Sequence, residues 1–209
     1  MKEKMIIKVC GMRDAHNIRE VEALGVDWIG MIFYPRSLRY VSEVPAEGRP
    51  RRAKRVAVFV DAPLADICRT VRDYAFDLVQ LHGDESPQLC RDLRKALPGV
   101  KIVKAFSVKD AASLQGVAQY EGTADYYLFD THCDSRGGSG QMFDHALLQA
   151  YTGSTPFLLS GGLSPDNVRE VKALKHPMLA GYDLNSRFET APALKDPALI
   201  KQFIETIKS

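Results

Sequence analysis

The stretch that decides the fold reads Tyr126-Tyr127-Leu128-Phe129-Asp130-Thr131-His132-Cys133-Asp134-Ser135-Arg136-Gly137-Gly138-Ser139-Gly140-Gln141-Met142-Phe143-Asp144. Its first four residues are apolar or aromatic, as in a parallel strand that is covered on both faces. The run stops at Asp130. Burying a lone carboxylate is costly, so an acid at this position indicates either a role in chemistry or a cap on its own loop. The glycines at 137, 138 and 140 let backbone N–H groups approach an anion, and we expect a helix to begin at Asp144.

The same change from strand to helix recurs along the chain. Apolar residues with helical spacing (i, i+3, i+4, i+7) occur within 64–71 and 200–207, and weaker stripes lie within 89–97 and 168–174. Alternating strands and helices connect by right-handed crossovers and form a parallel sheet. We expect strands at residues 5–9, 27–33, 55–60, 77–81, 100–106, 125–130, 156–160 and 178–184.

Eight such units favour an α/β fold of the closed (β/α)8 type, a TIM barrel formed by a single domain over residues 1–209. An open doubly wound sheet is the alternative, because the chain is short for a closed barrel. Two units are expected to be irregular. Two prolines and a glycine interrupt the second helix near residues 45–50, and Gly116 lies inside the fifth, at 110–120.

Composition limits the classes of function. Hydrophobic residues make up 45% and charged residues 26% of the chain, as in an ordinary water-soluble globular protein. No run of about 18 apolar residues is present, so no membrane span is expected, and the first residues lack a signal-peptide core. A net charge of +2, without clustered basic and aromatic residues, gives no support for nucleic-acid binding.

The four cysteines, at 10, 68, 90 and 133, are widely spaced and form no CxxC pair. In the absence of a secretion signal, we expect reduced thiols in a cytoplasmic protein. No cluster of histidine and acidic residues has the spacing of metal ligands, so no metal site is expected.

In a barrel of this class, functional residues lie where strands end and loops begin. The seventh strand runs into Ser160-Gly161-Gly162-Leu163-Ser164-Pro165, where two glycines allow close backbone approach to a ligand. We expect Ser164 to cap the next helix and Pro165 to occupy its first position, so that free N–H groups there favour phosphate. A well-capped helix after a tight turn, without a ligand, is the alternative.

Cys10 and His82 also follow expected strands. A small cysteine at a strand end is more often inert core than reagent, but Cys10 shares its ring of strand ends with Asp130. A thiol acts as a general base only when its pKa falls from about 8.5 toward neutrality. His82 is either a ligand contact or a loop histidine with partners of its own.

Five motifs stand in order along almost the whole chain. They are Lys8-Val9-Cys10-Gly11; Phe33-Tyr34-Pro35-Arg36-Ser37-Leu38-Arg39-Tyr40; Val79-Gln80-Leu81-His82-Gly83; Phe129-Asp130-Thr131 with Gly137-Gly138-Ser139-Gly140 and Phe143-Asp144; and Leu159-Ser160-Gly161-Gly162-Leu163. Together they resemble the phosphoribosylanthranilate isomerase family, a (β/α)8 barrel of tryptophan biosynthesis. That family converts N-(5′-phosphoribosyl)anthranilate to 1-(2-carboxyphenylamino)-1-deoxyribulose 5-phosphate without a cofactor or a metal.

The resemblance implies the catalytic roles. Asp130 matches the general acid that protonates the ribose ring oxygen, so that the ring opens to a Schiff base. Cys10 matches the general base that removes the C2′ proton, after which the enolamine tautomerises to the ketone. Arg39 matches the arginine that pairs with the anthranilate carboxylate, and we add His82 as a candidate substrate contact.

The resemblance also implies how the 5′-phosphate is held. The backbone around Gly161 and Gly162 and that around Asn185 and Ser186 would bind it. The expected partner is therefore a small phosphorylated molecule. The sequence leaves open whether the chain is a monomer or a homodimer.

Two positions depart from the family pattern. The loop after the eighth strand commonly reads Asp-Val-Ser-Ser-Gly-Val-Glu, and here it reads Asp183-Leu184-Asn185-Ser186-Arg187-Phe188-Glu189. Arg187 adopts a positive φ less readily than glycine, and it either contacts the phosphate or points outward. His145 stands where tryptophan is common, which is expected to change only packing.

Two rival functions remain. Another phosphosugar barrel, such as the histidine-pathway Amadori isomerase or the tryptophan synthase α subunit, is the nearest enzyme; the first is expected to have aspartate where Cys10 stands. From a different class, the chain is a barrel that only binds a phosphorylated metabolite. The presence of both Cys10 and Asp130 argues against the second alternative.

Overall fold

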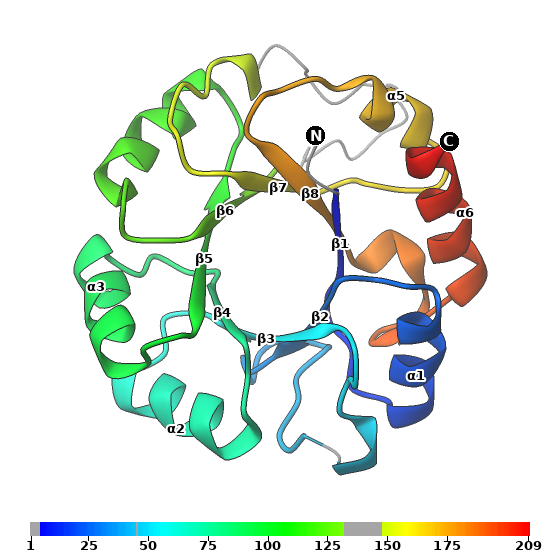
Figure 1. The fold of residues 1–209 in the computed structure, drawn as a ribbon, viewed down its shortest axis with the longest axis horizontal. Coiled ribbons are helices and arrows are strands. Elements are labelled where there is room, and N and C mark those ends of the chain that lie inside the picture. Colours follow the sequence, from blue (N-terminus) through cyan, green and yellow to red (C-terminus); the bar gives the residue numbers. More distant parts are fainter. Residues whose placement is uncertain (1–4, 45, 132–147) are drawn as a thin grey trace.

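Eight parallel strands form a closed barrel in the structure, a computed structural model that describes residues 5–44, 46–131 and 148–209 (Figure 1). The strand order follows the sequence, and β8 pairs with β1 to close the ring. The predicted (β/α)8 class is confirmed, and each strand lies within two residues of its expected limits. The strands are β1 Ile6–Val9, β2 Trp28–Ile32, β3 Lys54–Phe59, β4 Leu78–Leu81, β5 Lys101–Ser107, β6 Tyr126–Asp130, β7 Phe157–Ser160 and β8 Leu179–Leu184.

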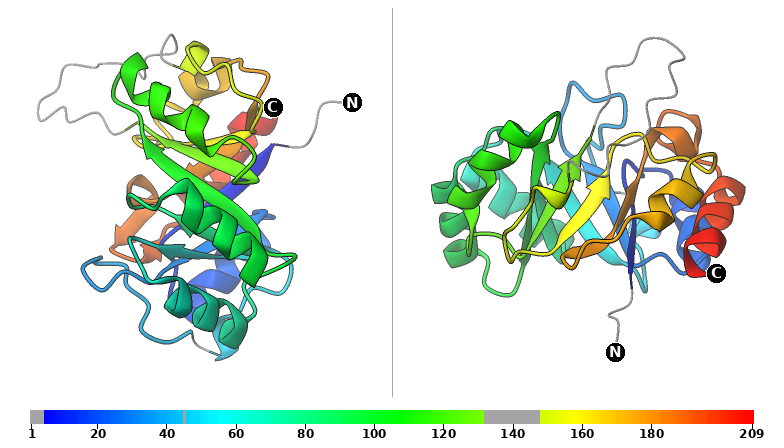
Figure 2. Two further views of the ribbon diagram at one scale, coloured as in Figure 1. Left: turned by 90° about the vertical axis from the view of Figure 1, so that its left-hand side faces the viewer. Right: turned by 90° about the horizontal axis from the view of Figure 1, so that it is seen from above.

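Helices surround the barrel on the outside, as Figure 2 shows from two further directions. No helix in the described ranges is long and apolar enough to cross a membrane. A short antiparallel pair, β9 and β10, follows the eighth strand. These elements are α1 Ala15–Ala23, η1 Ala46–Gly48, α2 Leu64–Tyr74, α3 Pro87–Ala96, η2 Ala111–Tyr120, α5 Val168–Ala173, η3 Ser186–Phe188, β9 Glu189–Ala191, β10 Leu194–Lys195 and α6 Pro197–Lys208.

The second and fifth units are irregular, as the sequence predicts. A single 3-10 turn, η1, stands in place of the second helix, and η2 is a 3-10 segment that contains Gly116. Proline and glycine explain both, because each disfavours a continuous α-helix. The predicted glycine-rich loop at 137–140, the helix start at Asp144 and the effect of His145 on packing lie outside the described residues.

One predicted helix start is wrong. Ser164 was expected to cap the seventh helix, but α5 begins only at Val168, with Asn167 at the N-cap. The Asn167 side chain explains the shift: its Oδ1 accepts the Ser164 backbone N–H at 2.9 Å, and its Nδ2 donates to the Gly162 carbonyl at 2.9 Å. These bonds stabilise a turn through Pro165, so the chain reaches helical geometry three residues later.

The strands separate an outer core from the barrel interior. Ile7 and Val9 belong to the cluster that packs under the helices, whereas Cys10 belongs to a separate inner cluster with Val58 and Leu128. Because strand side chains alternate between faces, Lys8 points into the interior with Cys10. Since all eight strands are parallel, their carboxyl ends share one rim, and the residues that follow them lie together there.

On the opposite rim, one arrangement repeats three times. Asp27, Asp77 and Asp125 stand directly before β2, β4 and β6, and their carboxylates accept a backbone N–H from β1, β3 and β5 at 3.0, 2.8 and 2.8 Å. Each aspartate also donates its own backbone N–H to the carbonyl of the same residue. This pairing fixes the register of neighbouring strands at the end of the barrel that is away from the candidate site.

Glu22, near the end of α1, ties the segment before β3 to the helix. Its Oε1 accepts the backbone N–H groups of residues 51, 52 and 53 at 2.7, 2.6 and 2.9 Å. Burial acts to raise the pKa of Glu22, but these three donors outweigh it and hold the pKa below its ordinary value of 4.5. The charged carboxylate therefore stabilises the folded state.

We predict that Glu22→Gln lowers the free energy of unfolding by about 1–3 kcal/mol at pH 7, because backbone donors lose a charged acceptor. A lowered folded-state pKa stabilises above the unfolded pKa and ceases to do so as the pH falls through the folded value. The difference between wild type and variant in urea unfolding should thus be full at pH 7 and shrink below pH 4.5. Glu20→Gln, on the exposed side of α1, is the control, and an equal loss there would contradict the assignment.

Candidate active site

One cavity of about 240 Å³ lies at the rim where the strands end. Its lining comes from the ends of β1, β2, β3, β4, β6, β7 and β8 and from loops that follow them. All eight candidate residues from the sequence line it: Cys10, Arg39, His82, Asp130, Gly161, Gly162, Asn185 and Ser186. Arg187, whose direction the sequence left open, lines the cavity as well.

Asp130 ends β6 and lies opposite Ser160 in the pairing with β7. A Cβ placed on Gly161 would lie 2.5 Å from Asp130 Oδ1 and 2.6 Å from the backbone nitrogen of Thr131, and Gly161 has a φ of +83°. Only glycine therefore lets the loop after β7 pass this close to the carboxylate. Packing against Asp130 accounts for this glycine independently of any ligand.

His82 faces Asp130 from the end of β4. Its Nε2 lies 3.7 Å from Asp130 Oδ2, and its Nδ1 lies 2.8 Å from Nε2 of Gln80, a residue buried in β4. An amide nitrogen only donates, so in this arrangement Nδ1 accepts and Nε2 carries the proton that points toward Asp130. His82 is thus oriented by the barrel interior as well as by its loop.

Cys10 follows β1 and is only 3% exposed. Lys8, fully buried two residues earlier, donates from Nζ to Asp183 Oδ2 at 2.8 Å. The other carboxylate oxygen of Asp183 is buried and has no hydrogen-bond partner among the described residues. A Cβ on Gly30 would lie 2.9 Å from Cys10 Sγ and 3.4 Å from Lys8 Cε, so a glycine in β2 makes room for both.

Burial raises the pKa of the Cys10 thiol. The Lys8 ammonium lowers the same pKa through its charge and a hydrogen bond, Asp183 raises it, and Lys195 lowers it more weakly. The cation required for a reactive thiol is therefore present, but burial outweighs it. In the structure as described, the pKa of the Cys10 thiol is therefore raised rather than lowered toward neutrality.

Arg39, in the loop after β2, is held by a protein carboxylate. Its Nε donates to Glu189 Oε1 at 2.8 Å and its Nη2 donates to Oε2 at 2.5 Å. The side chain of Glu189 is 5% exposed and that of Arg39 is 20% exposed, so the carboxylate is largely removed from water. Among the described residues Nη1 makes no hydrogen bond, and that part of the guanidinium stays available on a residue that lines the cavity.

Residues of this site that sequence reasoning missed include Lys8, Gln80, Glu189 and Lys195. Lys8 and Gln80 carried a signal, because each is a polar residue inside an apolar strand, two positions before Cys10 or His82 and thus on the same face. Nothing in the sequence pattern marked Glu189 or Lys195 as part of the site. They lie in the β9–β10 pair, whose position depends on tertiary contacts.

Within residues 5–44, 46–131 and 148–209, no three His, Cys, Asp or Glu side chains are grouped so as to hold a metal ion. Cys10, Cys68 and Cys90 are free, buried thiols, and Cys133 lies outside the described residues.

We predict that Lys8→Met destabilises the fold, because it leaves the Asp183 carboxylate buried without its counter-ion. The free energy of unfolding, measured by urea denaturation at pH 7, should fall by about 3–5 kcal/mol. The double variant Lys8→Met, Asp183→Leu should lose less than Lys8→Met alone, because it removes both charges. Equal losses in the two variants would show that the effect comes from packing rather than from the ion pair.

Comparison with known proteins identifies the family. Residues 7–206 match the family model described as N-(5′phosphoribosyl)anthranilate (PRA) isomerase. An N-(5′-phosphoribosyl)anthranilate isomerase of Phocaeicola vulgatus is 49% identical over 204 residues, which cover 98% of each chain.

Phosphoribosyl anthranilate isomerase from Thermotoga maritima matches with a TM-score of 0.82 and 30% identity, over 98% of this chain and 99% of that one. Another solved structure, with a TM-score of 0.80, 28% identity and the same coverage, is a phosphoribosyl anthranilate isomerase in complex with reduced 1-(o-carboxyphenylamino)-1-deoxyribulose 5-phosphate. The chain therefore belongs to the N-(5′-phosphoribosyl)anthranilate isomerase family of tryptophan biosynthesis.

Proposed function

We propose that the chain converts N-(5′-phosphoribosyl)anthranilate to 1-(2-carboxyphenylamino)-1-deoxyribulose 5-phosphate, with Asp130 as general acid and Cys10 as general base. One observation carries the proposal. A single cavity holds a carboxyl group, a thiol, an arginine and a pair of glycines, which are the groups that this reaction requires. The bound product analogue in a related isomerase supports the same class of ligand.

Asp130 acts first. It donates its proton to the ribose ring oxygen while the bond from that oxygen to C1′ breaks, and the nitrogen lone pair forms the C=N bond of a Schiff base. The His82 Nε2 proton, which faces Asp130 Oδ2, stabilises the carboxylate that this step leaves behind. The close passage of Gly161 holds the acid in place.

Cys10 acts second. Its thiolate takes the C2′ proton, and the released electron pair forms the C1′–C2′ double bond of the enolamine as the iminium nitrogen is neutralised. The C2′ hydroxyl then loses its proton while C1′ gains one, which gives the ketone. Because burial raises the pKa of the thiol, the thiolate depends on the adjacent Lys8 ammonium.

The two anionic ends of the substrate go to different groups of the cavity. Arg39 takes the anthranilate carboxylate, since a planar guanidinium suits a planar anion. The backbone around Gly161 and Gly162, with Asn185 and Ser186, holds the 5′-phosphate, and no metal or cofactor takes part. A Cβ on Gly162 would meet nothing within 4 Å, so this glycine leaves open space beside the cavity for a ligand.

A fluorescence assay of the purified protein with freshly made N-(5′-phosphoribosyl)anthranilate tests the proposal. We expect turnover by wild type and a loss of about 10²–10⁴ in kcat for both Cys10→Ser and Asp130→Asn, the usual contribution of a positioned acid or base. KM should change little, because neither group holds the phosphate or the carboxylate. If the folded wild type shows no turnover, the protein only binds a phosphorylated metabolite. If Cys10→Ser keeps full activity, another residue is the base.

The two neighbouring glycines should differ in their effects. Gly161→Ala pushes a methyl group against Asp130 and should lower kcat by about tenfold or more, since a misplaced acid is a poor proton donor. Gly162→Ala projects into open space and should mainly raise KM by blocking phosphate. Steady-state kinetics on both variants, with circular dichroism as the folding control, measure the split. If both variants changed kcat and KM in the same way, the separate roles assigned to Gly161 and Gly162 would be wrong.

A further inference from the structure

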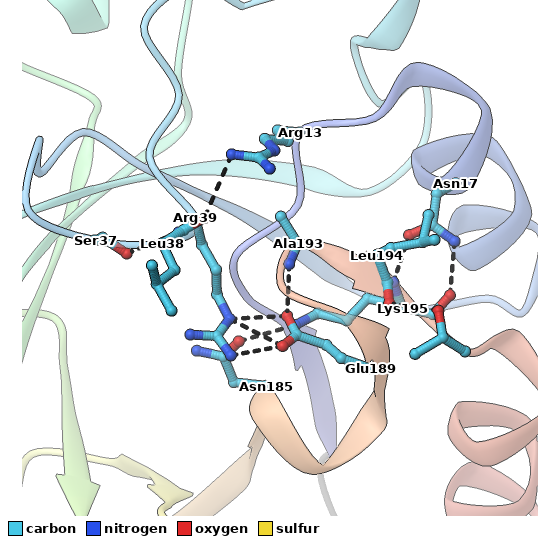
Figure 3. A network of polar contacts seen from close by, with 11 residues as sticks. Arg13, Asn17, Ser37, Leu38, Arg39, Asn185, Glu189, Ala193, Leu194 and Lys195 are labelled. Carbon is cyan, nitrogen blue, oxygen red and sulfur yellow. Dashed lines mark hydrogen bonds and ion pairs between the residues drawn. The ribbon is translucent and has the colours of Figure 1, made fainter.

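Three parts of the chain meet at the carboxylate of Glu189, which Figure 3 shows from close by. Oε1 accepts Arg39 Nε at 2.8 Å, the Ala193 backbone N–H at 3.2 Å and Lys195 Nζ at 2.5 Å, and Oε2 accepts Arg39 Nη2 at 2.5 Å. Glu189 is 5% exposed and Lys195 is fully buried. The carboxylate thus binds two cations away from water, where such charged hydrogen bonds are strong and directional.

The bond to Glu189 decides which edge of Arg39 faces a ligand. Glu189 occupies the Nε and Nη2 edge of the guanidinium. Because the group is planar and rigid, binding at one edge also fixes the direction of the other, which carries Nη1. Arg39 lines the cavity, so the free edge is preset to receive a second carboxylate.

Lys195 sets the orientation of Asn185 in the same way. Lys195 Nζ donates to Asn185 Oδ1 at 2.8 Å. An ammonium group only donates, so the amide oxygen must face Lys195 and the NH₂ group must point in the other direction. Asn185 lines the cavity, and its two N–H donors are then available to an anion there.

Arg39 and Asn185 are also adjacent to each other. A Cβ on Gly11 would lie 2.5 Å from Arg39 Cδ and 3.0 Å from Asn185 Oδ1, and Gly11 has a φ of +76°. The two side chains therefore pack over the glycine that follows Cys10, which only glycine permits. Arg39 and Asn185, which are assigned to the carboxylate and the phosphate, therefore pack on the same glycine.

The position of Lys195 is fixed by its backbone. Asn17 Nδ2 on α1 donates to the Lys195 carbonyl at 2.8 Å, and the Lys195 N–H donates to Asn17 Oδ1 at 2.8 Å. Ala193 holds a φ of +67°, a strained value for a residue other than glycine, and its N–H donates to Glu189. The β9–β10 pair thus holds both charged side chains before any ligand binds.

We propose that Glu189 and Lys195 are positioning residues that aim Arg39 and Asn185 at the two anionic ends of one substrate, a carboxylate and a phosphate. This inference rests on the proposed function, because it names the substrate groups that the two aimed residues meet. Neither positioning residue touches the reacting atoms. Their removal should therefore weaken ligand binding and leave the chemical step largely intact.

Two probes, inorganic phosphate and the reaction product, test the roles of Lys195 and Glu189 separately in the full chain. By calorimetric titration, Lys195→Met should weaken inorganic phosphate by about tenfold or more, because Asn185 loses its fixed orientation. Glu189→Gln should weaken the anthranilate-bearing reaction product by about tenfold or more and phosphate by less, because Arg39 loses its charged partner. In steady-state kinetics both variants should raise KM by a larger factor than they lower kcat, since Lys195 has only a weak effect on the pKa of Cys10.

The controls use a matched pair and an isosteric change. Lys201→Met and Glu205→Gln remove an exposed lysine–glutamate pair on α6 and should leave both affinities unchanged. If Lys195→Met fails to fold, Asn185→Asp is the alternative: it retains an acceptor for Lys195 but turns an oxygen toward the phosphate, so it should lose phosphate binding and stay folded. Unchanged phosphate affinity in the folded variant overturns the proposal, as does a loss of kcat at unchanged KM.

These binding measurements do not depend on turnover. A wild type that binds phosphate but does not convert N-(5′-phosphoribosyl)anthranilate would overturn the proposed function. The effect of Lys195→Met on phosphate affinity would still test the positioning role. A wild type that turns over, with variants of unchanged affinity, would overturn only the positioning role.

Discussion

The ion pair between Lys8 and Asp183 is the interaction on which the rest of the site depends. It joins β1 to β8, the two strands whose pairing closes the barrel, and it lies inside that barrel directly below Cys10. A charge in this position is tolerable only with its partner, because removing one partner leaves an uncompensated charge in a medium of low polarity. The closure of the fold and the electrostatic surroundings of the thiol are therefore set by the same two side chains.

Three cations at or near the cavity are bound to protein carboxylates rather than left free. Lys8 pairs with Asp183, and Arg39 and Lys195 pair with Glu189. Recognition of an anionic ligand then depends on which edges and N–H groups remain after these pairs have formed. Such an arrangement favours geometric selection over general attraction, since each cation has lost rotational freedom before the ligand arrives.

The two rims of the barrel divide stability from chemistry. At one rim, Asp27, Asp77 and Asp125 exchange backbone hydrogen bonds with neighbouring strands and fix their register. At the other, glycines replace side chains where loops must pass close to a reactive group, as Gly161 passes Asp130.

The sequence by itself predicted the barrel from local patterns and brought Cys10, His82 and Asp130 to one rim, whereas Arg39, Asn185 and Ser186 entered as site residues through the resemblance to a known family. Alternation marked the strands, helical spacing marked the helices, and parallel strands bring residues such as Cys10 and Asp130 to one rim. Local pattern failed at Asn167, whose side chain competes with the helix start expected at Ser164. Only the tertiary structure decided that Arg39 meets Glu189 and Lys8 meets Asp183, pairs that are 150 and 175 residues apart. No periodicity links such distant positions, because their meeting depends on how the closed ring brings its first and last strands together.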